Sequence, residues 1–430
     1  MTKKVGVAIL GLGVVGGGTY KTLVEHREFY LKTQSVDIEV ETVLVRNKDK
    51  ALALGVPEDR IAGSIEEVVA NPNVDIVIET IGGVDAAKDY VLTALREGKT
   101  VVTANKELIC KYSHELERAA KRTGCGLYYE ASCVGGVPII RTLLDGVQAN
   151  HVGEMMGIIN GTTNYILSKM AQEGAGYAET LAEAQRLGYA EADPTNDVEG
   201  YDAAYKLSIL ASLAFHTKVP YAKIFREGIS NISGKDITFG KEFGYTLKLL
   251  AIAKNIGKGV EVRVHPTFIP STHPLASVND AFNAVYLKGD AVGDIMLYGR
   301  GAGALPTASA VVSDVIYAAT HSEVKYSTFK NNATAENNVK FVSDFTSAYY
   351  IRLGVDDEAG VLTKMTGIFA KYGVSIVEVA QKGRASNSED LRVPLVIITH
   401  KTTESSIKNT VAKINASGIA TVKSVIRVEE

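Results

Sequence analysis

The segment from Gly188 to Leu207 concentrates side chains whose types and spacing could do chemistry. It carries five carboxylates and a lysine, namely Glu191, Asp193, Asp197, Glu199, Asp202 and Lys206. A carboxylate can hold the ammonium group of a small zwitterion, and a lysine can donate a proton to a developing oxygen anion. The segment therefore indicates a site that binds a small zwitterion and moves a proton.

Asp202 and Lys206 stand four residues apart, on one face of a helix predicted over Gly200–Phe215. One interpretation is a surface ion pair worth about 0.3–0.5 kcal/mol. The other is a partly buried lysine beside a carboxylate, which can protonate a forming alkoxide. The helix is apolar almost throughout, which favours burial. We expect the three remaining aspartates and glutamates after Glu191 to cap the helix and shape the loop: Asp193, Asp197 and Glu199.

A glycine-rich turn from Gly11 to Gly16 follows a predicted strand and opens a predicted helix. A dinucleotide-binding G-x-G-x-x-G turn requires this context, although a turn without a ligand is the alternative. Gly11 permits the tight turn, Gly13 lets the backbone approach a pyrophosphate, and Gly16 lets helix and strand pack. We expect the cofactor to lie on this turn: Gly11, Leu12, Gly13, Val14, Val15 and Gly16.

The second predicted strand, Ile38–Val45, ends without the acidic residue that commonly binds the ribose 2′-OH of NAD. Arg46 and Lys48 stand there instead, and a guanidinium favours the 2′-phosphate of NADP. Two solvated loop cations are the alternative. We expect NADP(H) to be preferred and NAD(H) to be possible, with Arg46 as the main contact and Lys48 assisting.

Two further strand ends carry candidate ligands. Lys106 follows a predicted strand at the edge where open α/β sheets bind ligands, so it could contact the cofactor or a substrate carbonyl, or start a helix at the surface. The turn Asn160–Asn164 leads from a strand into a helix, for which Thr162 is the expected N-cap. The free N–H groups of that turn could also hold a substrate carboxylate.

Glu130 closes the fifth predicted strand and precedes a loop of small residues that ends at Pro138. One carboxylate together with main-chain carbonyls suits a hard monovalent or divalent cation and not zinc. Cys133 in this loop could instead be a nucleophile, although no histidine lies nearby in the sequence to activate it.

Short apolar strands alternate with helices over the first ~130 residues, which predicts an α/β fold with a Rossmann-type, doubly wound parallel sheet. The predicted strands are Val5–Leu10, Ile38–Val45, Val74–Glu79, Val101–Thr103 and Leu127–Glu130. The predicted helices are Val14–His26, Ile65–Val69, Ala86–Glu97 and Leu108–Arg122. We expect this domain to span residues 1–136 and to regain a segment at about 304–326, with a helix at Ala308–Thr320.

Residues 137–303 predict a second, α+β domain. Its predicted strands are Met155–Ile159, Val260–Pro266 and Phe282–Lys288. Its predicted helices are Thr163–Gln172, Tyr177–Leu187, Gly200–Phe215 and Gly244–Ile256. The polar, asparagine-containing stretch 327–347 is expected to be a linker.

Residues 348–430 predict a separate unit with the βαββαβ order of the ferredoxin-like split βαβ arrangement. The predicted elements are Tyr349–Val355, Val361–Tyr372, Ser375–Ala380, Val393–Thr399, Glu404–Ser417 and Val422–Arg427, with a polar hairpin loop at Lys382–Asp390. The unit contains no dense cluster of catalytic groups, so it is a regulatory module or a plain dimerisation module.

The composition limits the classes of protein to which this chain can belong. A chain of 430 residues suggests two or three domains. A net charge of −3 does not favour nucleic acid or an anionic membrane, and no apolar run reaches the roughly 18 residues of a membrane span. Cys110, Cys125 and Cys133 form no Cys-x-x-Cys motif, which argues against disulfides or structural zinc. With no signal peptide expected, we predict a reduced, cytoplasmic protein.

These motifs together resemble homoserine dehydrogenase, in the bacterial form with a C-terminal ACT domain. The matching stretches are Gly11–Gly16, Thr103–Lys106, Glu130–Pro138, Asn160–Tyr165, Gly188–Lys206 and Arg300–Gly303, with Asp357–Val361 at the usual ACT ligand turn. The resemblance implies NAD(P)H-dependent reduction of L-aspartate 4-semialdehyde to L-homoserine, in the biosynthesis of threonine, methionine and isoleucine.

The resemblance also implies residue roles. Lys206 would protonate the alkoxide, Asp202 would position substrate and orient Lys206, and Lys106 would contact the reacting region and cofactor. The implied substrate contacts are Gly161, Thr162, Gly188, Glu191 and Asp202. Additional cofactor contacts are Thr80 and Gly303. A sodium ion would be held by Glu130 and by the carbonyls of Cys133, Gly135 and Val137. Threonine would bind as an effector at Asp357, Gly360 and Val361.

One residue departs from this family pattern, because Arg300 stands where proline is expected and adds a cation near the nicotinamide crevice. The resemblance further implies a homodimer or homotetramer. Two rival functions stay open: an aspartate-semialdehyde dehydrogenase that uses Cys133 as a thiolate, and a non-catalytic amino-acid sensor. The presence of Glu191, Asp202 and Lys206 argues against the sensor.

Overall fold

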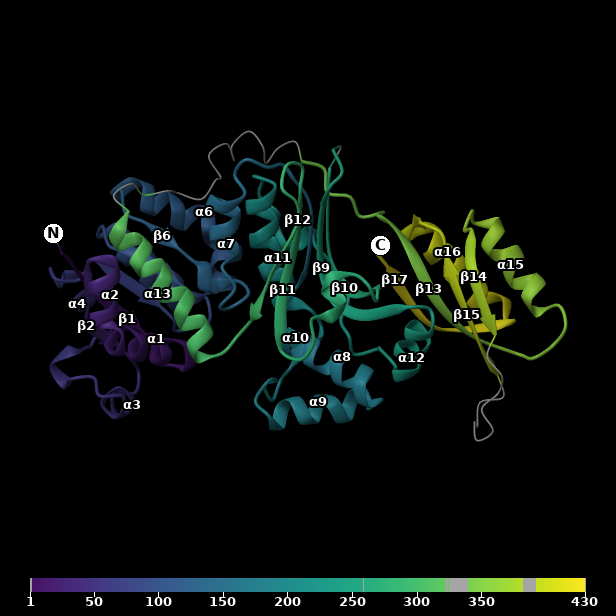
Figure 1. Cartoon of the computed structure of the whole chain (residues 1–430), viewed down its shortest axis with the longest axis horizontal. Helices are drawn as coiled ribbons and strands as arrows, with labels where there is room; N and C mark the ends of the chain where they lie inside the picture. Colours follow the sequence, from purple (N-terminus) through teal and green to yellow (C-terminus); the bar gives the residue numbers. More distant parts are fainter. Residues whose placement is uncertain (1, 258, 322–323, 325–338, 382–391, 430) are drawn as a thin grey trace.

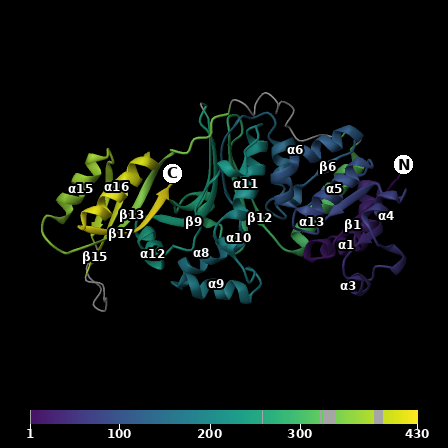
Figure 2. The same cartoon turned by 180° about the vertical axis from the view of Figure 1, so that it is seen from behind.

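The molecule has three parts side by side along its longest axis, seen from opposite sides in Figure 1 and Figure 2. This computed structural model describes residues 2–257, 259–321, 324, 339–381 and 392–429. The predicted hairpin loop Lys382–Asp390 and most of the predicted linker lie outside the described residues. Among the described residues, no helix is both long and apolar enough to cross a membrane.

The N-terminal part is a parallel sheet with the strand order β3-β2-β1-β4-β5-β6. Its strands are β1 (Lys3–Leu10), β2 (Val36–Leu44), β3 (Ile61–Ala62), β4 (Ile76–Glu79), β5 (Thr100–Thr103) and β6 (Leu127–Tyr128). The inner strands β1 and β4 are buried apolar runs, as expected of a parallel sheet covered on both faces. The predicted doubly wound sheet is confirmed, and its chain order reverses between β1 and β4, where such sheets bind ligands.

Helices cover this sheet, and one of them returns from much later in the chain (Figure 1). They are α1 (Val14–Glu25), α2 (Arg27–Gln34), α3 (Lys48–Ala53), α4 (Ile65–Ala70), α5 (Asp85–Arg96), α6 (Lys106–Thr123) and the returning α13 (Ala304–Thr320). A Cβ added at Gly18 of α1 would lie 2.7 Å from the carbonyl oxygen of Ala304. Glycine at position 18 therefore permits the close approach of α13 to α1.

The central part contains a sheet with the order β12-β11-β7-β9-β10. Its main strands are β7 (Val152–Ile158), β9 (Tyr245–Asn255), β10 (Val260–Pro270), β11 (Phe282–Gly289) and β12 (Gly293–Arg300), and a short β8 (Phe225–Arg226) pairs with β10. Its helices are α7 (Ile139–Arg141), α8 (Gly161–Glu173), α9 (Tyr177–Arg186), α10 (Thr195–Val198), α11 (Tyr201–Ala214) and α12 (Gly234–Glu242). The predicted strands of this part and the helices at α8, α9 and α11 are confirmed.

The predicted helix over Gly244–Ile256 is wrong, because these residues form β9 between β7 and β10. Most of β9 is buried, so apolar residues occupy both of its faces and the alternation that marks a strand is lost. Gly244 adopts φ +79° directly after α12, a conformation that ends a helix. β12 was not predicted either.

The C-terminal part has the predicted βαββαβ order. Its elements are β13 (Thr346–Val355), α15 (Val361–Lys371), β14 (Ile376–Gln381), β15 (Val393–Thr399), the short β16 (Thr402–Thr403), α16 (Glu404–Ser417) and β17 (Ala420–Val428). The antiparallel strand order is β17-β13-β15-β14. β17 also pairs in parallel with β10, through Thr267 with Arg427 and Phe268 with Val428. One continuous sheet of 11 strands therefore joins the central and C-terminal parts.

Buried charges and a short strap reinforce this junction. Glu429 is buried, forms an ion pair with Arg263 at 2.8 Å and accepts a hydrogen bond from Lys254 at 2.7 Å. The end of the predicted linker lies along β10, where the Val260 N–H donates to the Lys340 carbonyl at 2.9 Å. Residues 339–345 are therefore held against the sheet and do not form a free linker.

Candidate active site

Asp202 is a buried carboxylate with a lysine at each oxygen. Its Oδ1 lies 2.5 Å from Lys106 Nζ, and its Oδ2 lies 2.7 Å from Lys206 Nζ. Lys106 begins α6 directly after β5, whereas Asp202 and Lys206 share one face of α11. The predicted helical pair is confirmed, and the structure adds Lys106 from the N-terminal part to it.

The electrostatics of this trio exclude a solvated surface pair. Burial opposes the ionisation of Asp202, but Lys206 and Lys106 outweigh it and hold the pKa of the carboxyl well below its usual range. The Asp202 charge in turn raises the pKa of Lys106. The side chain of Lys206 is 11% exposed and that of Lys106 is 40% exposed, so Lys206 is the deeper of the two cations.

The junction between β7 and α8 supports the trio from the other side. The Ile159 carbonyl accepts from Lys206 Nζ at 2.9 Å, and Asn160 Nδ2 donates to Asp202 Oδ2 at 2.9 Å. Asn160 is also the N-cap of α8, because its Oδ1 accepts from the Thr163 N–H at 2.9 Å. Thr162 was expected to be this cap. It instead donates its hydroxyl proton to the Tyr189 carbonyl at 2.6 Å.

The acid-rich loop, residues 191–199, contains side chains that contact the surroundings of Asp202, Lys106 and Lys206 and side chains that do not. Asp197 lies inside, because it accepts from Asn160 Nδ2 at 2.7 Å and from the Thr162 hydroxyl at 3.2 Å. Burial and the neighbouring Asp202 charge raise the pKa of Asp197. Glu191 is exposed, and within the described part of the chain no ion pair joins it to Lys106 or Lys206. Gly188 adopts φ +78° in the same exposed loop.

The sequence predicted only a capping or loop-shaping role for Asp197, and its contacts beside Asp202 were not expected. Asp193 has the predicted loop-shaping role, because it accepts from the Thr195 N–H and hydroxyl. Glu199 accepts from the Ser230 hydroxyl at 2.5 Å. No local pattern distinguishes Asp197 from these neighbours, because its partners Asn160 and Thr162 come from an earlier element.

The glycine-rich turn has the geometry of a phosphate-binding loop. Gly11 adopts φ +87°, and a Cβ added at Gly16 would lie 1.9 Å from the Gly11 carbonyl oxygen. A Cβ added at Gly13 would meet nothing within 4 Å, so the backbone there is open to a ligand. Thr80 holds the turn from below, because its hydroxyl donates to the carbonyls of Leu10 and Gly11 at 3.0 and 2.8 Å.

Another buried carboxylate, Glu79, organises the same edge of the sheet and was not singled out from the sequence. It accepts from the Thr103 hydroxyl at 2.5 Å and from the Ile81 N–H at 2.9 Å. Asn105 caps α6 by accepting from the Leu108 N–H at 3.0 Å, which sets the direction in which α6 presents Lys106.

Arg46 and Lys48 are exposed beyond the end of β2. The Gly11 N–H donates to the Leu44 carbonyl at 2.9 Å, so this strand end adjoins the glycine-rich turn. Asn47 between them caps α3. No ion pair neutralises either cation among the residues that the structure describes, so both are available to an anionic ligand.

The turn before α13 packs against the loop that follows Glu130. The Gly136 N–H donates to the Arg300 carbonyl at 3.0 Å, and Gly303 adopts φ +116°. The Arg300 guanidinium lies 5.3 Å from the centroid of the Phe282 ring and its side chain is exposed. Arg300, which stands where the family pattern has proline, therefore makes a cation–π contact with Phe282.

Glu130 and the loop after it form a tightly organised corner. The Glu130 carboxylate accepts from the N–H groups of Ile140 and Arg141 at 2.8 and 2.6 Å, and burial together with Asp314 raises its pKa to about 7. Val134 and Gly135 adopt φ +57° and +55°. The left-handed region is costly for a β-branched residue, so this turn is held in place by its surroundings.

Cys133 in that corner does not have the properties of a nucleophile. Its side chain is fully buried, and burial raises the pKa of the thiol to about 12. A reactive cysteine needs the thiolate form and access to substrate. The geometry therefore argues against the aspartate-semialdehyde dehydrogenase alternative.

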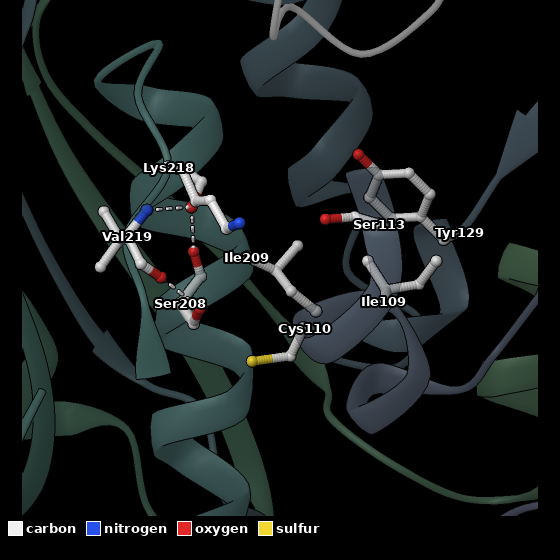
Figure 3. Close-up of a pocket in the computed structure, with 9 residues that line it drawn as sticks. Ile109, Cys110, Ser113, Tyr129, Ser208, Ile209, Lys218 and Val219 are labelled. Carbon is white, nitrogen blue, oxygen red and sulfur yellow. Dashed lines mark hydrogen bonds between the residues drawn. The ribbon is translucent and has the colours of Figure 1, made fainter. Parts of the chain in front are cut away.

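The contact between α6 and α11 sets the spacing of the two lysines. Figure 3 shows the interface within about one turn of them, with Ile109 and Cys110 of α6 facing Ser208 and Ile209 of α11. A cavity of about 20 Å³ remains between the helices, which is room for roughly one water molecule. Ser208 donates to the Val219 carbonyl at 2.6 Å, which ties the middle of α11 to the loop that follows the helix.

The residues expected to bind an effector lie far from this site, at the start of α15. Gly360 is the N-cap of α15 with φ +88°, and Val361 is the first residue of the helix. Asp357 accepts from Gln381 Nε2 at 2.8 Å. The structure brings these three residues together in one turn.

Family models match most of the part that holds the site. Residues 11–130 match the model described as "Homoserine dehydrogenase, NAD binding domain", and residues 138–316 match the model described as "Homoserine dehydrogenase". The boundary between the two matches lies in the loop after Glu130, between the part with Lys106 and the part with Asp202 and Lys206.

Full-length relatives and solved structures agree. The chain is 42% identical to homoserine dehydrogenase of Bacillus subtilis and 40% identical to that of Neisseria gonorrhoeae, over 99% and 96% of both chains respectively. A crystal structure of a homoserine dehydrogenase from Thiobacillus denitrificans aligns with a TM-score of 0.92 at 41% identity, over 100% of this chain and 99% of that one. The protein belongs to the homoserine dehydrogenase family of NAD(P)-dependent oxidoreductases.

Proposed function

We propose that Lys206 and Asp202 handle the proton of the homoserine dehydrogenase reaction in this chain. The bound nicotinamide supplies the hydride that converts L-aspartate 4-semialdehyde to L-homoserine. The chain's own groups have to orient the aldehyde and give its oxygen a proton. One observation carries this proposal: the buried Asp202 carboxylate contacts both Lys106 and Lys206. Lys106 belongs to the part whose sheet also carries the glycine-rich turn.

Of the two lysines, we assign proton donation to Lys206 and contact with the reacting region and cofactor to Lys106. The Lys206 ammonium is aimed by two fixed acceptors, the Ile159 carbonyl and Asp202. The raised pKa of Lys106 makes its ammonium a weaker acid than an ordinary lysine. These features support Lys206 as the donor.

We assign the remaining substrate contacts to the two segments that meet beside this pair. The N–H groups of Gly161 and Thr162 stand at the start of α8, where the helix dipole favours the substrate carboxylate. Glu191 and the Gly188 backbone are assigned to the substrate ammonium. The bond from the Thr162 hydroxyl to the Tyr189 carbonyl holds the loop from Gly188 to Glu191 next to α8, which supports this division.

Replacing Lys206 by methionine should lower kcat for NADPH oxidation with L-aspartate 4-semialdehyde by about 10²–10⁴-fold, the usual contribution of a positioned acid. NADPH binding, followed by its fluorescence, should change little. Lys169→Met is the matched control, because Lys169 pairs with Glu173 at an exposed helical i,i+4 position. A Lys206→Met enzyme with kcat within fivefold of wild type would show that another group delivers the proton.

For the cofactor, we propose that NADPH is preferred over NADH and that Arg46, assisted by Lys48, binds the 2′-phosphate. Both cations are exposed beside the glycine-rich turn, and β2 ends without an acid that would bind a ribose 2′-OH. Thr80 and Gly303 are proposed to border the same site. A hyperthermophilic archaeal homoserine dehydrogenase, 27% identical over 75% of this chain, was solved in complex with NADPH.

Arg46→Ala should reduce kcat/KM for NADPH by about 10–100-fold, because a charge-assisted hydrogen bond contributes about 1.5–3 kcal/mol. The value for NADH should stay within about twofold, since NADH lacks the phosphate. Lys50→Ala, an exposed cation on α3, serves as the control. An unchanged ratio of the two kcat/KM values in Arg46→Ala would contradict the assignment.

We also propose that a sodium ion binds at Glu130 and the carbonyls of Cys133, Gly135 and Val137. The residues fit such an ion in kind, because a carboxylate has about four lone-pair sites and Glu130 uses two for N–H groups. Oxygen donors are the ligands that hard cations select. When bound, the ion would order the loop that carries Val134 and Gly135.

Sodium chloride should therefore raise the thermal midpoint of the enzyme above that in choline chloride of equal ionic strength. At a sodium concentration 100 times the Kd, the free energy of unfolding rises by about 2.7 kcal/mol. Glu130→Gln should remove the difference between the two salts. Equal midpoints for the wild type in sodium and choline would rule the site out.

Residues 348–430 are proposed to be an ACT domain that binds L-threonine as a feedback effector at Asp357, Gly360 and Val361. The turn at Gly360 exposes the start of α15, where free N–H groups can hold a carboxylate.

Threonine should inhibit NADPH oxidation, and Asp357→Ala should raise the threonine concentration for half-inhibition without changing kcat. Inhibition that is identical in the variant would place the effector elsewhere.

We further propose a homodimer or homotetramer formed through the central sheet, with residues 1–136 and about 304–326 as the cofactor domain and residues 137–303 as the substrate and dimerisation domain. Met296 and Tyr298 on β12 are 39% and 53% exposed, and such residues are enriched at interfaces. Light scattering that gave the mass of a single chain would contradict this.

The three cysteines are free, which is consistent with a reduced, cytoplasmic location.

A further inference from the structure

Lys248 is a buried lysine that the proposed chemistry does not use. It lies on β9 and is 1% exposed. Its ammonium donates to the Val278 carbonyl at 2.5 Å, to Asn279 Oδ1 at 3.2 Å and to Asn164 Oδ1 at 3.3 Å. Each of its three protons thus has an acceptor, and the side chain ties β9 to α8 and to the turn 278–282.

Asn164 extends this network within the first turns of α8. Its side-chain amide donates to the carbonyls of Val278 and Phe282, at 3.1 Å each. The turn 278–282 also touches the first residue of the helix, because a Cβ added at Gly161 would lie 2.9 Å from the Ala281 carbonyl oxygen. The start of α8 is therefore held from one side by Lys248, Asn164 and this turn.

The other side of the same short segment contacts the proton-handling pair. The Ile159 carbonyl accepts from Lys206, and Asn160 donates to Asp202. Residues 159–164 thus connect two buried clusters, with Lys248 at one end and Asp202 with Lys206 at the other. A shift of this segment changes the direction of the Lys206 ammonium and the position of the N–H groups at Gly161 and Thr162.

We infer that Lys248 is a positioning residue of the active site. It holds Asn164 and the turn 278–282 in place, so that the β7–α8 junction keeps the substrate and the Lys206 ammonium in the geometry that the reaction needs. The inference rests on the proposed function, because it concerns the same site. A purely structural role predicts lower stability alone. A positioning role predicts weaker substrate binding and slower turnover in enzyme that is still folded.

The charge of the clamp gives a second observable. Burial lowers the pKa of Lys248 to about 8, with Asp280 opposing the shift as the charged group that faces it. Above pH 8 the side chain loses one proton and can satisfy only two of its three acceptors. The KM for the aldehyde in wild-type enzyme should therefore rise above about pH 8.

The test compares Lys248→Met with Lys254→Met. Lys254 lies on the same strand and is also partly buried, but it pairs with Glu154 at 3.0 Å and Glu429 at 2.7 Å, away from the junction. Lys248→Met should raise KM for L-aspartate 4-semialdehyde and lower kcat, with a combined loss in kcat/KM on the order of 10–100-fold. The Kd for NADPH should change less than about twofold. Lys254→Met should lower the thermal midpoint while leaving KM for the aldehyde within about twofold.

The outcomes separate this inference from the proposed function. Wild-type enzyme that does not oxidise NADPH with the aldehyde overturns the proposed function itself. Active wild type with a Lys248→Met KM near normal, or with equal KM changes in both variants, overturns the positioning role. If Lys248→Met does not fold, Asn164→Ser and the pH profile of the wild type decide: a normal KM in the variant, or a wild-type KM that is flat from pH 7 to 9.5, overturns it.

Discussion

The buried charge of Asp202 is the constraint on which the site depends. An unpaired carboxylate away from water costs several kcal/mol, so its partners have to be present together. One ammonium comes from α6 of the N-terminal part, the other from α11 of the central part, and an amide comes from the β7–α8 junction. Neutralising this carboxylate therefore fixes the two parts relative to each other, with the glycine-rich turn on one side and the acid-rich loop on the other.

The packing around the trio keeps these partners from adjusting independently. The turn from Arg300 to Gly303 packs on the loop after Glu130, and α13 then lies so close to α1 that glycine is required at position 18. The chain thus crosses between the two parts at the loop after Glu130 and again before α13. Two crossings restrict hinge motion, which suits a reaction that needs cofactor and aldehyde held in one geometry.

Sequence patterns predicted the features that depend on neighbours in the chain. The Asp202–Lys206 pair, the glycine-rich turn and the βαββαβ order are local, and the structure has all three. The contacts of Lys106 and Asp197 with residues on distant elements were beyond such patterns. The same reason explains the error at β9, where burial on both faces removes the alternation, and at Thr162, where Asn160 two residues earlier takes the cap.

The parallel pairing of β10 with β17 has a consequence for the order in which the molecule forms. Thr267 and Phe268 pair with Lys248 and Leu247 of β9 on one side, but on the other side they find partners only when Arg427 and Val428 have been synthesised. Until then, the edge of β10 presents unpaired backbone groups at this position, and such an edge can pair with another chain. The contact is also distant in sequence, and contacts of this kind close late. Completion of this edge of the central sheet is therefore a late folding step, and until it occurs the enzyme is most exposed to association with its own copies.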